Sequence, residues 1–237
     1  MHPLDNPVWT SLTGTHAGFA QRRGDALRYP PDVAPWAALP LDAGAAAWRD
    51  LAALAGPGAE FTVAGDPRTP PDGWAEVMRM PGVQLDGSGM HVAPDAEAVL
   101  LGPADVPEMR ALVARTEPGP FEPRTREMGT YLGIRRGGVL VAMAGERLRP
   151  PGWSEISAVC TDPAVRGQGL ASRLVRAVGA AIRERGDVPF LHAAAANVDA
   201  VRLYERLGFT LRRTLEFAVF RVPGRQRTHG AGRGSTS

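Results

Sequence analysis

The chain has 237 residues, of which 44% are hydrophobic, and a formal net charge of +2 at pH 7. This length is large for one domain and small for two independent ones, and the hydrophobic content is sufficient for a packed core. All 27 basic residues are arginines, scattered without interleaved aromatic residues, which argues against a nucleic-acid-binding surface and indicates a GC-rich bacterial genome.

The single cysteine, Cys160, excludes an internal disulfide and a cysteine-rich metal site. The sequence shows no signal peptide and no apolar run long enough to cross a bilayer. We therefore expect a cytoplasmic protein that contains no metal and binds neither nucleic acid nor membrane.

Residues 1–93 are hard to assign. The alanine-rich segment from Ala43 to Leu54 predicts a helix, and Glu60 to Ala64 and Val77 to Leu85 contain short strand-like pieces separated by prolines. Four of the five tryptophans lie here and are expected to be buried in a core. Two interpretations remain open: a degenerate half-domain packed on a sheet, or a cap over the ligand site.

From Val99 onward the pattern becomes regular. A helix is expected from Val106 to Arg115, with Pro107 in its first turn. The apolar run from Val139 to Ala144 is typical of a strand covered on both faces. Further strands are expected at 99–101, 131–134, 156–161, 190–192, 210–213 and 215–222, a helical turn at 125–129, and helices beginning near 170 and 197. The tail 223–237 is polar and glycine-rich, so we expect it to be disordered.

The segment from Ser154 to Phe209 carries the clearest chemical signal. After a strand, Arg166-Gly167-Gln168-Gly169 opens a helix whose first N–H groups suit a phosphate, because a helix N-terminus bears unpaired donors and partial positive charge. The glycines leave room for a ligand, although they are also compatible with a simple turn. A dinucleotide loop is excluded, because a third glycine and an acid closing the next strand are missing.

This segment resembles the GNAT acyl-CoA-dependent acetyltransferases. Arg166, Gly169 and Ala171 match the family's pyrophosphate loop, and Asn197, Tyr204 and Gly208-Phe209 match its second block. The resemblance implies an α/β fold for residues 94–222, with a mixed, mostly antiparallel central sheet flanked by helices. It also implies acetyl-CoA as co-substrate, an amine as acceptor, and a V-shaped gap between the strands at 156–161 and 190–193.

The resemblance also assigns donor contacts. The backbone of Val159, Cys160 and Thr161 would bind the pantetheine arm as an added strand does, and Asn197 would also contact this arm or serve only as a helix cap. The pyrophosphate loop comprises the following residues: Arg166, Gly167, Gln168, Gly169, Leu170, Ala171 and Ser172.

Two side chains are candidates for proton transfer. The resemblance places the Tyr204 hydroxyl beside the CoA sulfur, where it would protonate the thiolate; the alternative is an aromatic ring that only packs the helix on the sheet. Glu155, expected to share a strand face with Ser157 and Val159, would accept the amine's proton if that face lines the gap, or it is a solvated acid at a strand end.

The remaining titratable residues have plainer interpretations. His192 is expected to be a hydrogen-bonded core or edge histidine rather than a proton shuttle, and His16 and His91 to lie on the surface. Cys160 lacks an activating neighbour, so its backbone and not its thiol is expected to contribute. Three acids of the proline-rich loop are expected to be solvated: Glu117, Glu122 and Glu127.

The sequence leaves two functions open. One is an N-acetyltransferase that transfers the acetyl group of acetyl-CoA to a small-molecule or peptide amine by direct attack on the thioester. The other is a non-catalytic acyl-CoA-binding sensor. The acceptor is not specified, and the assembly is expected to be a monomer or a homodimer.

Overall fold

A computed structural model describes residues 2–65 and 69–224 of the chain. Its centre is an eight-stranded sheet in the order β4-β11-β5-β10-β9-β8-β7-β6, in which only the β9–β10 pair is parallel. The mixed, mostly antiparallel sheet with flanking helices confirms the expected fold class. The strands of this sheet are β4 Glu60–Gly65, β5 Ala75–Asp86, β6 Val99–Leu100, β7 Tyr131–Arg136, β8 Val139–Glu146, β9 Trp153–Thr161, β10 Val188–Ala194 and β11 Thr210–Arg221.

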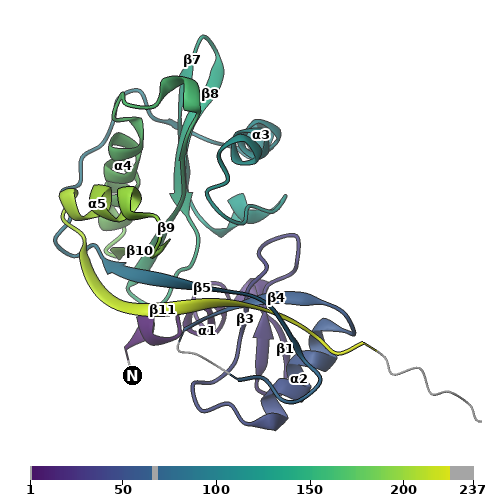
Figure 1. Cartoon of the computed structure of the whole chain (residues 1–237). Coiled ribbons are helices and arrows are strands. Elements are labelled where there is room, and N and C mark those ends of the chain that lie inside the picture. The colour runs from purple at the N-terminus through teal and green to yellow at the C-terminus, as the bar shows by residue number, and fades with distance from the viewer. Residues whose placement is uncertain (1, 66–68, 225–237) are drawn as a thin grey trace, which may run out of the picture.

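Helices cover both faces of the sheet. Helix α4 (Leu170–Glu184) packs on β7 to β10, and α3 (Val106–Thr116) packs on β8 and β9 from the opposite face (Figure 1). Helix α5 (Val198–Arg206) follows β10 and carries Tyr204 into the core beside α4. None of the helices in the described part of the chain is long and apolar enough to cross a membrane.

The N-terminal region is more regular than the sequence indicated. It contains the short helices η1 (Pro3–Asp5) and α1 (Pro7–Leu12), helix α2 (Ala45–Ala55), and a small sheet of β1 (Gln21–Arg23), β2 (Ala26–Arg28) and β3 (Ala37–Ala38). Helix α2 confirms the expected helix, and β4 the expected strand.

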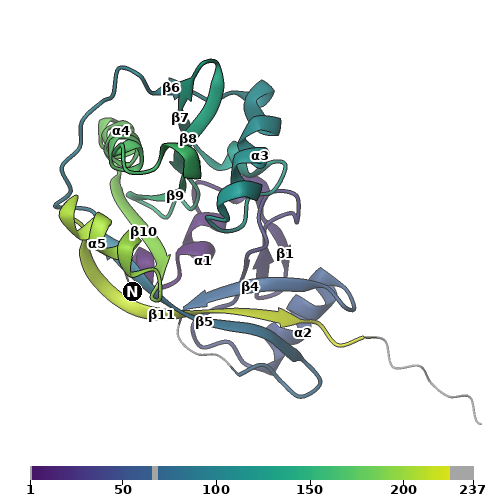
Figure 2. The ribbon, with the colours of Figure 1, turned by 45° about the horizontal axis from the view of Figure 1, so that its top comes forward.

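Strands β4 and β5 also come from residues before 94, yet they belong to the main sheet, where β5 lies between β10 and β11 (Figure 2). The expected boundary near residue 93 therefore follows a strand in the interior of one continuous sheet. Residues 225–237, most of the expected disordered tail, lie outside the described residues.

Three expectations about the N-terminal region and about strand β11, which pairs with it, were wrong. Pro81 does not break β5, because β10 pairs with β5 only from Gly82 onward, so the missing N–H falls where β5 has a partner strand on one side only. The two final strands are one, β11, with a bulge between Leu211 and Arg213. His16 is buried rather than exposed: its Nδ1 lies 2.8 Å from the Tyr29 hydroxyl and its Nε2 3.0 Å from the Met128 carbonyl. His91 is exposed, as expected.

Candidate active site

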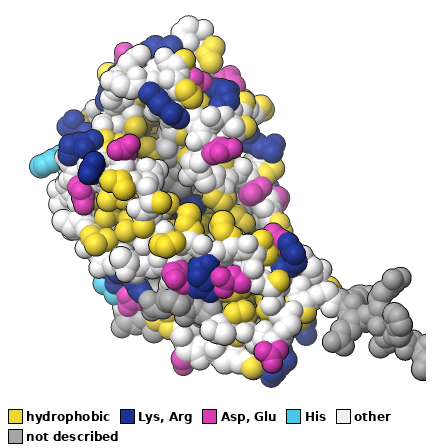
Figure 3. All heavy atoms as spheres, viewed as in Figure 1, with side chains coloured by type: hydrophobic (Ala, Val, Ile, Leu, Met, Phe, Trp, Pro, Cys, Tyr) yellow, Lys and Arg dark blue, Asp and Glu magenta, His cyan; other side chains and the backbone are white. Residues whose placement is uncertain are grey.

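A cleft of about 960 Å³ opens where β9 and β10 separate. The two strands pair only from Trp153 to Glu155 and from Val188 to Phe190, and they diverge beyond these residues. Figure 3 shows this face of the molecule hollowed near its middle and surrounded by hydrophobic side chains. The V-shaped gap expected between these strands is therefore present.

One half of the cleft is formed by the glycine loop and α4. Gly167 and Gly169 have φ values of +81° and +72°, in the left-handed region that favours glycine, and a Cβ at either position would point into open space. Gly169 is the N-cap of the 15-residue α4, and no side chain caps this helix. The unpaired N–H groups of the first turn, with Arg166 beside them, thus face a space that a phosphate can enter.

Most residues expected at the donor site line this cleft. Gln168, which is exposed, does not line it, and neither does Glu155, the candidate base. The expected donor residues that do line it are Val159, Cys160, Thr161, Arg166, Gly167, Gly169, Leu170, Ala171, Ser172, Asn197 and Tyr204.

Strand β9 is distorted beside the cleft. Cys160 is the partner of Met143 and Ser157 the partner of Gly145, so Ala158 and Val159 together oppose one residue of β8, and Ala158 has a φ of +51°. Such a bulge re-aims side chains and breaks the simple alternation of faces. For this reason the expected common face of Glu155, Ser157 and Val159 does not extend along the strand.

The two candidates for proton transfer have different surroundings. Tyr204 lines the cleft, its hydroxyl has no hydrogen-bond partner among the described residues, and burial raises its pKa to about 12.

Asn197 caps α5, because its Oδ1 accepts from the N–H of Ala200 at 3.2 Å, and it also lines the cleft. Burial raises the pKa of the Cys160 thiol to about 11, so the thiol is neutral and unreactive at ordinary pH.

Glu155 is fully buried and paired. Its carboxylate accepts two hydrogen bonds from Arg147, at 2.9 and 2.7 Å, and lies 2.7 Å from Nδ1 of His192. Burial alone would raise the pKa of Glu155, but the charge of Arg147 and the hydrogen bonds from Arg147 and His192 hold it below its ordinary value. Glu155 therefore reaches the cleft only through Arg147 and His192, which both line it.

Comparison with known proteins decides the family. The family described as FR47-like protein matches residues 131–218. A crystal structure of a protein assigned to the GNAT acetyltransferases, from Novosphingobium aromaticivorans, is 42% identical, has a TM-score of 0.86, and covers 93% of this chain and 98% of its own. N-alpha-acetyltransferase RimI of Mycobacterium tuberculosis is 34% identical over 144 residues, 55% of this chain and 89% of that protein.

The chain belongs to the GNAT acetyltransferases. It is an acyltransferase that acetylates an amine, and these relatives do not favour the alternative of a non-catalytic sensor. A shorter match, to mycothiol acetyltransferase of Thermobispora bispora, is 49% identical over 57 residues and spans 24% of this chain and 19% of that protein.

The second half of this GNAT cleft was not found by sequence reasoning. Trp36 was expected to be buried, and it is, but it also lines the cleft. Glu117 was expected to be a solvated loop acid; it is exposed and borders the opening. Five other residues of this half lie in no sequence motif that would indicate a binding site: Thr62, Met78, Met80, Arg147 and Phe217.

Proposed function

We propose that this GNAT enzyme binds acetyl-CoA in the half of the cleft formed by the glycine loop, α4 and α5, and receives its amine acceptor from the opposite half. The uncapped N-terminus of α4, with two left-handed glycines opening on the cleft, is the observation that carries the proposal. Members of this family use acetyl-CoA, which supplies the acetyl thioester.

Each part of the donor half has a definite task in this proposal. The N–H groups of residues 170–172 and the guanidinium of Arg166 bind the pyrophosphate. The bulged backbone at Val159 to Thr161, which has no strand partner on its cleft side among the described residues, binds the pantetheine amides. The neighbouring N–H groups polarise the thioester carbonyl.

The reaction requires two proton transfers, one to the leaving sulfur and one from the amine. The Tyr204 hydroxyl, which stays protonated because burial raises its pKa to about 12, donates to the leaving sulfur. The attacking amine gives its proton to water in the cleft, and we propose that Glu155 affects this step only by holding Arg147 in place, because Glu155 does not itself line the cleft. One relative is named as an N-alpha-acetyltransferase and another as a mycothiol acetyltransferase, so the relatives' names do not agree on one acceptor.

A matched pair of glycine variants tests the donor site. Gly169→Val should weaken acetyl-CoA affinity by about 2–3 kcal/mol, as expected for the loss of one or two charge-assisted hydrogen bonds. Gly137→Val is the control: Gly137 also has a positive φ, +56°, and open space at its Cβ, but it lies in the β7–β8 turn away from the cleft. Calorimetry with acetyl-CoA should show a loss only for Gly169→Val, and equal affinities in both variants would refute the phosphate site.

A further inference from the structure

The half of the cleft opposite the glycine loop has an apolar wall. Trp36 contacts Phe217, with ring centroids 6.0 Å apart, and Met80 is the strand partner of Phe217 across β5 and β11. Thr62 and Met78 are both partners of Val219 and continue the same surface. The five residues of this wall are uncharged, and the acids that border the cleft, Glu117 and Asp199, lie outside the wall, after α3 and on α5.

Arg147 is the charged group at this wall. It is only 8% exposed, it lines the cleft, and its guanidinium carbon lies 5.0 Å from the centroid of the Trp36 ring. Nε and Nη2 donate to Glu155, whereas Nη1 makes no hydrogen bond with any described residue. Nη1 is not among the buried polar atoms that lack a partner, so it is accessible from the cleft and free to donate a hydrogen bond to a ligand there.

A chain of polar contacts fixes the orientation of this guanidinium. Glu155 also accepts from the N–H of Leu148 at 3.3 Å, and its Oε1 lies 2.7 Å from Nδ1 of His192. Nε2 of His192 lies 3.0 Å from Nε2 of Gln84, which also donates to the Leu4 carbonyl. The Gln84 oxygen accepts from Arg212, so the amide nitrogen must face His192.

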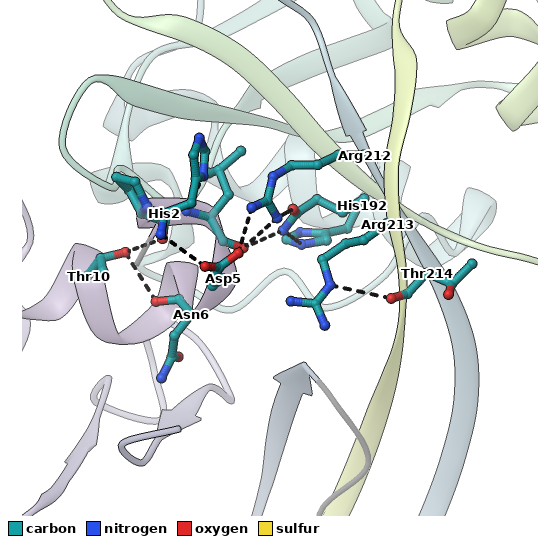
Figure 4. A network of polar contacts seen from close by, with 11 residues as sticks. His2, Asp5, Asn6, Thr10, His192, Arg212, Arg213 and Thr214 are labelled. Carbon is teal, nitrogen blue, oxygen red and sulfur yellow. Dashed lines mark hydrogen bonds and ion pairs between the residues drawn. The ribbon is translucent and has the colours of Figure 1, made fainter. Parts of the chain in front are cut away.

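His192 is therefore held as the neutral tautomer that donates from Nδ1 to Glu155 and accepts at Nε2, and neither nitrogen is left for a substrate. This agrees with the expected hydrogen-bonded core histidine. At the far end of the chain, Arg212 pairs with Asp5 of η1 at 2.5 Å (Figure 4). The charged groups around His192 are Glu155 and Arg147 on one side, and Arg212, Arg213 and Asp5 on the other.

We propose that Nη1 of Arg147 donates a hydrogen bond to a carbonyl oxygen next to the acceptor's amine, so that the acceptor is the α-amino group of a peptide or amino-acid amide with an apolar first side chain. The side chain packs against Trp36, Met80 and Phe217. A neutral carbonyl fits better than a carboxylate, because the Arg147 charge is already balanced by Glu155, which repels a second anion. This specificity rests on the proposed function.

Three acceptors test the proposal: phenylalaninamide, phenylalanine and 2-phenylethylamine. They share the phenyl ring and differ in whether an amide, a carboxylate or neither lies next to the amine. Release of CoA thiol gives kcat/KM for each, expressed per neutral amine. The wild-type enzyme should prefer phenylalaninamide over 2-phenylethylamine by roughly 10–100-fold, the value of one hydrogen bond to a charged group. Equal values would overturn the proposal, and a preference for free phenylalanine over the amide would overturn its choice of a carbonyl.

The double variant Arg147→Met/Glu155→Gln assigns the preference to Arg147. Both charges are removed together, because one alone would be left buried and unpaired. The amide preference should fall at least tenfold relative to wild type, and this ratio cancels any general effect of Glu155 on turnover. An unchanged ratio would refute the role of Arg147.

A control variant and two further outcomes complete the test. The control Arg185→Met/Glu146→Gln removes another ion pair, between the buried Glu146 and the exposed Arg185, that does not line the cleft, and it should keep the wild-type ratio. If near-ultraviolet circular dichroism shows that the Arg147 variant is unfolded, the wild-type ratio decides. Acetylation of none of the three amines, nor of a peptide beginning with an apolar residue, would contradict the proposed function itself.

Discussion

The Tyr204 hydroxyl combines burial with access to the cleft. The ring packs in the main core, 5.9 Å from the Phe209 ring, while the hydroxyl has no partner among the described residues. Because burial raises its pKa to about 12, the hydroxyl is protonated throughout any practical assay range. The same shift makes complete proton transfer to a thiolate less favourable than for an ordinary phenol, so its main contribution is a hydrogen bond to the developing charge.

Tyr204→Phe should therefore lower kcat while acetyl-CoA affinity and folding are retained, because the ring contacts remain. General acid assistance is typically worth about 10²–10⁴-fold, which sets the upper range of the effect. Tyr131→Phe is the matched control, since Tyr131 is also buried with an unpartnered hydroxyl but does not line the cleft. Turnover within twofold of wild type, with chemistry shown to be rate-limiting, would mean that Tyr204 only packs the helix.

At the scale of single elements, His16 joins the segment after α1 to two distant parts of the chain. Its ring bonds to Tyr29 and to the carbonyl of Met128 in η4 (Thr125–Met128). Burial lowers the pKa of His16 to about 4, below the ordinary value of 6.5. As the pH falls below 6.5, the unfolded chain binds a proton at this histidine and the folded chain does not, until about pH 4.

The stability that neutral His16 provides is thus present above pH 6.5 and lost between pH 6.5 and 4. Between pH 7 and pH 5, His16→Gln should lose about 2 kcal/mol less of its unfolding free energy than wild type does. Urea unfolding at the two pH values measures this difference. His91→Gln, a change at an exposed histidine, should behave as wild type, and an equal loss in His16→Gln would show that the burial of His16 does not govern the acid limb.

Elements with local signals could be predicted, and those that depend on their partners could not. Helix α4 follows from Gly169 before it and the apolar repeat within it, and α5 from Asn197 at its N-cap. The β9 bulge has no such signal, because Ala158 is not a residue that favours a positive φ; the surrounding sheet imposes it. The same holds for β5, which continues through Pro81 because β11 pairs with it there and β10 does not.

At the scale of the whole molecule, the two halves of the cleft differ in how they are encoded. The donor half comes from one continuous stretch, Ser154 to Phe209, so spacing along the sequence indicates it directly. The acceptor half is assembled from Trp36, Thr62, Met80, Arg147 and Phe217, which only the fold brings together. In particular, no sequence pattern distinguishes Arg147 from the other arginines, of which the chain has 27 in total. Its role depends on its burial and on its contact with Glu155, which only the fold provides.

The same sheet determines whether the GNAT segment can fold alone. Strand β5 separates β10 from β11 and pairs with both, so removal of residues 1–93 would leave β10 without its antiparallel neighbour and β11 without any strand partner. The apolar faces of Phe217 and Phe190, which pack in the N-terminal core with Leu4 and Trp36, would also be exposed. We therefore propose that residues 94–222 are a functional unit but not an independent folding unit.

A fragment of residues 94–224 should accordingly lack near-ultraviolet circular dichroism, bind a hydrophobic dye, and unfold in urea without a cooperative transition. The fragment 1–224 is the control, because it keeps every helix and strand of the described residues, and it should unfold in one transition. A cooperative transition in the shorter fragment, with acetyl-CoA affinity close to that of the full chain, would show instead that the boundary near residue 93 separates two domains and that β4 and β5 are dispensable additions to the sheet.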